Sequence, residues 1–204
     1  DGIQETGNGD VLYHMIEKHG SYGDKYWADA RAFRPITPED ISPINPEIED
    51  KYISVDVDHQ TMSCYENGQE ILFTRVSTGA KYDFKGRPTD KYLTPPGDYH
   101  AINRKYISLH MAGGEASKAS GYEEFAVAWT SIFAAGGVAI HSTHFHNEFG
   151  ETKSHGCVNA PPDVAKFIFR WTRPDTPYDP GKIEIQGYSG TNVKVVDSSF
   201  TENA

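Results

Sequence analysis

The chain has few cysteines, no excess of positive charge and no long apolar run. Only two cysteines occur in 204 residues, too few for a disulfide framework. The formal net charge is −10, which argues against binding nucleic acid or an anionic membrane surface, because both need basic patches. No apolar stretch is long enough to cross a bilayer. These absences leave a globular protein, and its hydrophobic content of 37% is enough for a sizeable core.

The chain begins with Asp1 rather than Met, so we expect a processed or trimmed product, and the missing signal peptide excludes no compartment. In an exported protein, Cys64 and Cys157 could form one bridge. We predict instead that both are reduced in the active form, because the chemistry described below needs a thiol at Cys157. Cys64 lies within an expected strand, where a small side chain with no chemical role is the simpler interpretation.

Residues 1–50 differ in pattern from the rest of the chain. Pro35, Pro38, Pro43 and Pro46 recur every three to five residues, a density that favours an extended connector. Before them, residues 11–17 and 22–33 are rich in Tyr and Trp and could pair as a small hairpin. We therefore predict an N-terminal extension with a Pro-rich linker over 1–50, or alternatively a small β module, followed by a main domain over 51–204.

The main domain has the pattern of short β-strands. Ile53, Val55 and Val57 alternate with polar residues, which predicts a half-buried strand. Asn67-Gly68 is a strong signal for a hairpin turn between two strands. Thr94-Pro95-Pro96-Gly97 predicts a rigid turn. The strands expected in addition to the first are residues 61–65, 71–77, 98–102, 124–132, 138–140, 182–186 and 192–196. Residues 111–122 contain several glycines and are expected to form a mobile loop.

One helix is expected, shortly after Asn159. Pro161 and Pro162 suit its first turn, Asp163 complements the dipole of its N-terminus, and Pro174 stops it. We expect Asn159 to be its N-cap. Many short strands and one helix predict a mainly β fold.

The residues of chemical interest are concentrated between His141 and Asn159. This stretch holds four of the nine histidines and one of the two cysteines. A thiol becomes a good nucleophile when a base accepts its proton, and His141, at the end of an expected strand, is the candidate base for Cys157. The backbone carbonyl of Ser142 could bind the second ring nitrogen of His141 and fix the tautomer.

The turn before Cys157 is a candidate oxyanion site. Ser154, His155 and Gly156 form it, and the glycine allows a backbone conformation that leaves amides pointing at one spot. The N–H groups of His155, Gly156 and Cys157 are the candidate donors to a tetrahedral intermediate. The N-terminus of the following helix is expected to lower the pKa of the thiol.

A metal site is the main alternative from the residues themselves. His141, His144, His146, His155 and Cys157 offer enough nitrogen and sulfur ligands for zinc. The spacing matches no common zinc pattern, however, and the helical His-Glu-x-x-His motif is absent. We therefore expect no metal and no cofactor.

Residues 51–196 resemble the L,D-transpeptidase catalytic domain of bacterial cell-wall enzymes. The features that match in order are Val55-Asp56 with Tyr65-Glu66-Asn67-Gly68, then Ser77-Thr78-Gly79, Thr94-Pro95-Pro96-Gly97, and His141 followed by Ser154-His155-Gly156-Cys157-Val158-Asn159. The last is highly specific. Residues 26–36 also resemble the tail of a small SH3-like module found upstream in some relatives. The resemblance implies a β-sandwich with one short helix after the catalytic cysteine.

The resemblance also implies roles and a substrate. Cys157 would be the nucleophile, His141 the base, and Ser154, His155 and Gly156 the oxyanion turn. The partner would be a peptidoglycan stem peptide outside the cytoplasm, cleaved before its terminal D-Ala through a thioester and joined to a second stem as a 3-3 cross-link. The candidate substrate contacts are Asn159, Tyr122 and Trp129. Tyr122 and Trp129 would belong, with residues 113–121, to a lid that excludes water. His144 and His146 match no family role, and Ser142 replaces the glycine of many members.

Three other functions stay open at this point. An L,D-carboxypeptidase on the same scaffold would use water in place of the acceptor amine, and the sequence does not separate it from a transpeptidase. A zinc-binding hydrolase would use the histidines as metal ligands. A non-catalytic wall-binding module would use neither the histidines nor a reactive Cys157. A papain-like protease is disfavoured, because there the cysteine precedes its histidine along the chain.

Overall fold

The computed structural model describes residues 2–16, 25–83, 85–113, 121–179, 184–187 and 190–198. These form three β-sheets with two short α-helices, α1 and α2, and two 3₁₀ turns, η1 (Ala30–Ala32) and η2 (Ala135–Gly137). The protein is therefore mainly β, as predicted. Within the described part of the chain, no helix is long and apolar enough to cross a membrane.

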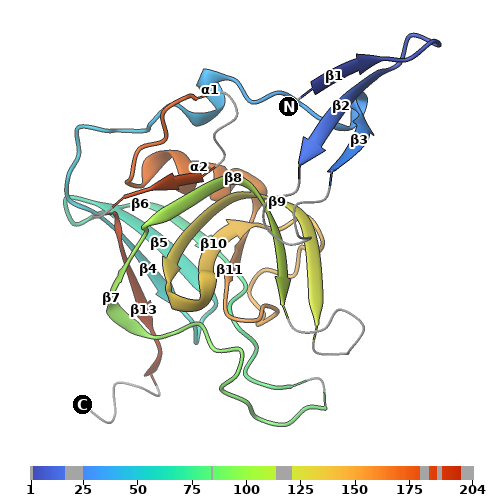
Figure 1. Ribbon diagram of the computed structural model, residues 1–204. Coiled ribbons are helices and arrows are strands. Elements are labelled where there is room, and N and C mark those ends of the chain that lie inside the picture. Colours follow the sequence, from blue (N-terminus) through green and yellow to red (C-terminus); the bar gives the residue numbers. More distant parts are fainter. Residues whose placement is uncertain are drawn as a thin grey trace.

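A small antiparallel sheet forms the N-terminal part. Its strands are β1 (Gly2–Glu5), β2 (Val11–Ile16) and β3 (Lys25–Asp29), in that order. β2 and β3 are the small hairpin that the Tyr- and Trp-rich segments predicted, although residues 17–24 lie outside the described residues. Figure 1 shows this sheet, in blue, projecting from one side of the molecule. The division of the chain at residue 50 stays a prediction.

One five-stranded sheet contains the hairpin predicted at Asn67-Gly68. Its order is β6 (Gln69–Arg75), β5 (Thr61–Glu66), β4 (Lys51–Asp56), β13 (Asn192–Val196) and β7 (Gly97–Ala101). The β5–β6 turn is made by Asn67 and Gly68, both with positive φ (49° and 77°), as a two-residue hairpin turn requires. β13 pairs with β4 in parallel, so the last described strand lies beside the first strand of the main domain.

The second five-stranded sheet carries the residues of chemical interest. Its order is β11 (Val158–Ala160), β10 (Val138–Ser142), β9 (Tyr122–Ala134), β8 (Arg104–Gly113) and β12 (Glu184–Gln186). β8 and β11 were not predicted: β8 changes register between Leu109 and Met111, which disturbs the alternation, and β11 has only three residues. Residues 111–113, predicted as loop, end β8, and 114–120 lie outside the described residues.

The two five-stranded sheets and α2 (Pro162–Trp171) share one apolar core, consistent with the predicted sandwich. α2 packs against β9 and β10. Its N-cap is Pro161, so the prediction that Asn159 caps the helix is wrong. Asn159 instead lies in β11. Its backbone N–H donates to the Ser77 carbonyl at 2.8 Å, and its carbonyl accepts from the Ser77 N–H at 2.9 Å.

Two buried lysines cap the C-terminal end of α2. Lys105 Nζ donates to the carbonyls of Phe169 (2.8 Å) and Thr172, and Lys51 Nζ donates to that of Trp171 (3.0 Å). The last carbonyls of a helix lack partners within the helix and carry partial negative charge, so cations stabilise them. Burial lowers the pKa of Lys105 to about 7. These contacts fix α2 against β4 and β8, the strands that carry the two lysines.

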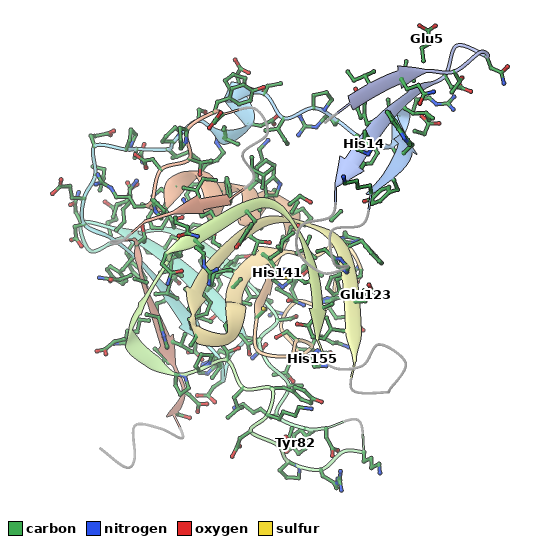
Figure 2. The ribbon with its side chains drawn as sticks, in the orientation of Figure 1. Glu5, His14, Tyr82, Glu123, His141 and His155 are labelled. Carbon is green, nitrogen blue, oxygen red and sulfur yellow. The ribbon has the colours of Figure 1, made fainter. Side chains whose placement is uncertain are left out.

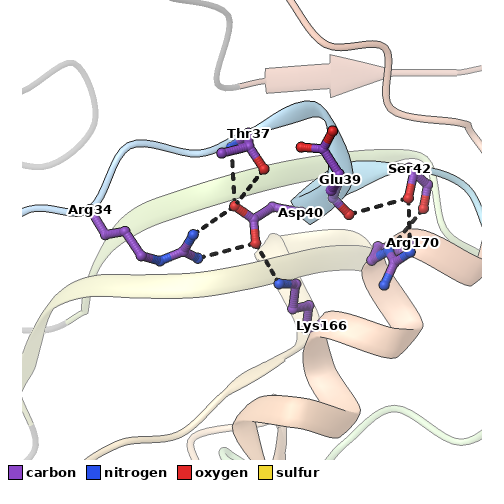
Figure 3. Close-up of polar contacts among 7 residues, drawn as sticks. All are labelled: Arg34, Thr37, Glu39, Asp40, Ser42, Lys166 and Arg170. Carbon is purple, nitrogen blue, oxygen red and sulfur yellow. Dashed lines mark hydrogen bonds and ion pairs between the residues drawn. The ribbon is translucent and has the colours of Figure 1, made fainter.

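The Pro-rich segment is fixed to α2 by a carboxylate that is only 8% exposed (Figure 3). Within that segment, residues Pro38–Ile41 form the single turn α1. Asp40 on this turn accepts from Arg34 Nη1 at 2.7 Å, from Lys166 Nζ of α2 at 2.6 Å and from the backbone N–H of Thr37 at 3.0 Å. These donors hold the pKa of Asp40 well below its usual range. The segment is thus bound to the main domain rather than freely extended.

Candidate active site

The pairing of two parallel strands brings the candidate base close to the segment that carries the candidate nucleophile. β10 and β11 pair with His141 opposite Asn159, so these two side chains lie on the same face of the sheet. Cys157 lies directly before β11, where the chain enters that strand. All three side chains line one cavity of about 140 Å³. The sheet register thus brings together three residues that the sequence marked as candidates.

His141 is held as a neutral base. Its Nδ1 lies 2.9 Å from the Ser142 carbonyl, which can only accept, so Nδ1 carries the proton and Nε2 keeps a lone pair. This is the contact predicted for Ser142. His141 is 4% exposed, and burial lowers its pKa to about 4, with smaller effects from His146 and His144 in the same direction. At neutral pH the ring is therefore ready to accept a proton.

The thiol of Cys157 is also neutral in the resting site. Burial raises its pKa to about 11, although a hydrogen bond from the Ala139 backbone N–H acts in the opposite direction. The predicted lowering of this pKa is wrong, because burial is its main cause of change and α2 begins only at Pro162. Both cysteines are unpaired. Cys64 lies in β5 within the core, where burial raises its pKa to about 12.

The turn that precedes Cys157 is stabilised by Ser154. The Ser154 hydroxyl donates to the carbonyl of Cys157 and accepts from the Gly156 N–H at 3.1 Å. Gly156 has φ +124°, a conformation that side chains rarely adopt. The Gly156 N–H, predicted as an oxyanion donor, is thus already bonded. The N–H groups of His155 and Cys157 are the candidates that remain.

Thr94, which was expected only to begin a rigid turn, supports this site. Its hydroxyl donates to the Gly156 carbonyl at 2.9 Å and accepts from the Gly79 N–H at 3.0 Å. The Gly156 carbonyl and the Cys157 N–H belong to one planar trans peptide and point in opposite directions. Thr94 therefore fixes the direction of the Cys157 N–H. At Gly79, a Cβ would lie 1.7 Å from the Tyr92 carbonyl oxygen, so this close approach requires glycine.

His155 belongs to an aromatic group at the rim of the cavity. Its ring stacks on that of Tyr122 with 4.8 Å between centroids and meets the edge of Tyr92 at 4.6 Å. Figure 2 shows His155 and His141 beside the β8–β9 hairpin. Tyr122 lines the cavity, which fits its predicted role as a substrate contact. The exposed His155 side chain shapes the entrance, while its backbone belongs to the turn.

Trp129 does not line the cavity, contrary to the prediction. It is 8% exposed and packs in the core, with its ring 5.4 Å from that of Phe169 and the Lys166 ammonium 5.2 Å from its centroid. Trp129 has a positive φ of 56°, which breaks the alternation of β9 and turns the side chain toward α2. A simple period of two could not show this.

Several lining residues were not predicted. They are Met111, Glu124, Val127, Phe145 and Lys153. Lys153 directly precedes Ser154, and this adjacency is the one signal in the sequence that could have identified it. Met111, Glu124 and Val127 reach the cavity from β8 and β9, strands whose pairing only the fold defines.

The histidines do not form a metal site. Among the residues that the structure describes, no three side chains of His, Cys, Asp or Glu gather closely enough to hold a metal ion. All five candidate ligands are described, and His144 is exposed. His141 also uses Nδ1 to bind a carbonyl. The zinc alternative therefore lacks a ligand set.

Comparison with known proteins identifies the family. Residues 50–193 match the model of the YkuD family, described as the L,D-transpeptidase catalytic domain. The chain belongs to this L,D-transpeptidase family. No curated protein matches the chain.

Solved structures of L,D-transpeptidases share the fold. The Mycobacterium smegmatis L,D-transpeptidase is 22% identical, with a TM-score of 0.55 over 72% of this chain and 59% of its own. LdtMt1 in complex with imipenem is 22% identical, with a TM-score of 0.54 over 72% and 58%. An Enterococcus faecium L,D-transpeptidase mutant is 28% identical, with a TM-score of 0.50 over 74% and 51%. The chain thus spans between half and three fifths of these relatives' lengths.

Proposed function

We propose that the protein is a peptidoglycan L,D-transpeptidase that forms 3-3 cross-links through a thioester on Cys157. The proposal rests on one observation: His141 on β10 and Cys157, directly before the adjacent strand β11, line one cavity within a domain of the L,D-transpeptidase family. The substrate would be a stem tetrapeptide outside the cytoplasmic membrane, in the cell envelope.

Cys157 and His141 are both neutral before the reaction, so its first half begins with a proton transfer from the thiol to the imidazole. As the Cys157 sulfur attacks the carbonyl carbon of the third stem residue, its proton moves to His141 Nε2. The Cys157 N–H, directed through Gly156, donates to the oxygen that becomes negative. When the C–N bond breaks, His141 returns the proton to the amine of D-Ala, which leaves, and a thioester remains on Cys157.

The second half reverses these roles. A side-chain amine of a second stem attacks the thioester carbonyl and gives a proton to His141. The C–S bond breaks, and the proton returns to sulfur, which restores the thiol. Water in place of the amine would make the enzyme an L,D-carboxypeptidase.

The test is incubation with a disaccharide-tetrapeptide followed by mass spectrometry. Loss of D-Ala together with stem dimers is expected, and Cys157→Ala should abolish both. Cys64→Ala is the matched control and should keep the activity, because Cys64 lies in the core. Loss of D-Ala without dimers would identify a carboxypeptidase. Activity that persists in Cys157→Ala would contradict the proposed nucleophile.

A further inference from the structure

His146 contacts a cavity residue through one ring nitrogen and its own loop through the other. Its Nε2 lies 3.0 Å from the terminal carboxamide nitrogen of Asn159. Its Nδ1 accepts a hydrogen bond from the backbone N–H of Glu148 at 3.3 Å. The ring lies 5.4 Å from that of Phe149. These contacts involve a histidine that matches no family role and that belongs to no cluster of metal ligands among the described residues.

The contact with Glu148 determines which nitrogen of His146 carries the proton. An imidazole that accepts at Nδ1 is neutral and carries its proton at Nε2. Burial also lowers the pKa of His146, which favours the neutral ring. With Nε2–H facing a carboxamide –NH₂ group, two donors would oppose each other. A half-turn of the carboxamide removes this conflict by placing Oδ1 opposite Nε2–H, and the two arrangements have the same shape.

This orientation determines which end of the Asn159 carboxamide faces the cavity. The backbone of Asn159 is fixed on both sides by Ser77, so only the side-chain torsions are free. With Oδ1 bound by His146, the –NH₂ group is the end that remains for the cavity, which Asn159 lines together with His141 and Cys157. The cavity that the nucleophile and base line therefore gains N–H donors.

We propose that His146 is a positioning residue that holds the Asn159 carboxamide with its N–H groups toward the cavity, where they donate to an oxygen of the acyl-donor peptide. This inference rests on the proposed function. The oxygen that fits is an amide carbonyl or a carboxylate beside the scissile bond, since both only accept. Without His146, the carboxamide can turn by half and present its own acceptor to the substrate.

Two substitutions at position 146 separate the two contacts. In His146→Asn, the side-chain oxygen can still accept from the Glu148 N–H, but the side chain is too short to reach Asn159. In His146→Gln, the terminal amide can reach Asn159 and donate to Oδ1. The matched control is His144→Asn, the same change at an exposed histidine two residues earlier.

The first measurement is the second-order rate of acylation of Cys157 by imipenem, followed by mass. His146→Asn should lower this rate about 5- to 10-fold, as expected for the loss of one oriented hydrogen bond. His146→Gln should restore it to within about twofold, and His144→Asn should leave it unchanged. In an Asn159→Ala background, His146→Asn should cause no further loss, because both changes remove the same donor. A normal rate in His146→Asn, or a loss that adds to that of Asn159→Ala, overturns the proposal.

The second measurement does not depend on activity. The ¹⁵N shifts of the His146 ring should show a proton on Nε2 and none on Nδ1 in the wild-type protein. A proton on Nδ1 overturns the proposal whatever the kinetics. If the wild-type protein is not acylated and releases no D-Ala, the proposed function fails. The role of His146 is then judged by the ring shifts alone.

Discussion

Replacing Thr94 by Val tests whether a side chain distant in sequence supports the oxyanion turn. Valine has the shape of threonine but neither donates nor accepts. The change leaves the Gly79 N–H and the Gly156 carbonyl, both buried, without the partner they share. Thr94 is itself 3% exposed, so water is not expected to take the place of the hydroxyl.

The magnitude follows from these two orphaned groups. Each buried polar group without a partner costs about 1–3 kcal/mol, and partial relaxation makes about 3 kcal/mol a reasonable total for the loss in free energy of unfolding. For a domain of this size, each kcal/mol lost from the free energy of unfolding lowers the melting temperature by about 2–4 °C. The melting temperature of Thr94→Val should therefore decrease by about 6–12 °C. Complete loss of an oxyanion donor costs about 10²–10³ in rate. A Cys157 N–H that is only less well directed should cost about tenfold.

The assays are thermal unfolding and acylation of Cys157 by imipenem at a temperature where the variant is folded. Thr94→Ser is the control, because it keeps the hydroxyl and loses one methyl group. It should keep the wild-type acylation rate and most of the stability. This role of Thr94 is refuted if Thr94→Val melts within about 2 °C of wild type and is acylated at the normal rate. It is equally refuted if the serine variant loses as much activity as the valine variant.

The remaining predictions concern pH. Because burial gives His141 a pKa of about 4 and Cys157 one of about 11, the acylation rate should be flat from about pH 5 to 9, and an acid limb near pH 6.5 would contradict the neutral pair. Asp40→Asn should lower the melting temperature at pH 7. The pKa of Asp40 is lowered in the folded protein, so the stability it adds is present above the unfolded value of 3.8 and is lost as pH falls. The difference in melting temperature should therefore shrink below pH 3.8, and a constant difference would contradict the role of the charge.

Local patterns predicted the residues whose chemistry is specific. Cys157 and His141 were identifiable as the candidate nucleophile and base because few side chains can act in these roles. The turn at Gly156 was identifiable because only glycine suits its backbone. The hairpin at Asn67-Gly68 and the helix ending before Pro174 follow from the same kind of short-range rule. Each depends on neighbours within a few residues.

The predictions were wrong for residues whose position depends on a contact distant in sequence or on an irregular backbone. Thr94 lies 62 positions before Gly156, and no rule of spacing connects them. Asn159 looked like a helix cap but pairs with Ser77 from another part of the chain. Trp129 looked like a cavity residue, but its positive φ turns it into the core. β1 and the bulged β8 were not predicted, because apolar and polar residues do not alternate regularly along them.

The residue pattern was enough to predict the mainly β fold and the family, and it identified Cys157 and His141 as the candidate nucleophile and base. Three features became apparent only from the packed sheets: the neutral state of that pair, the hydrogen bond that occupies the Gly156 N–H, and the contact of His146 with Asn159. The two groups of features differ in the distance along the chain over which their causes act. Backbone preference and side-chain chemistry belong to single residues and near neighbours, whereas desolvation and hydrogen-bond direction depend on segments that meet only when the sheets pack.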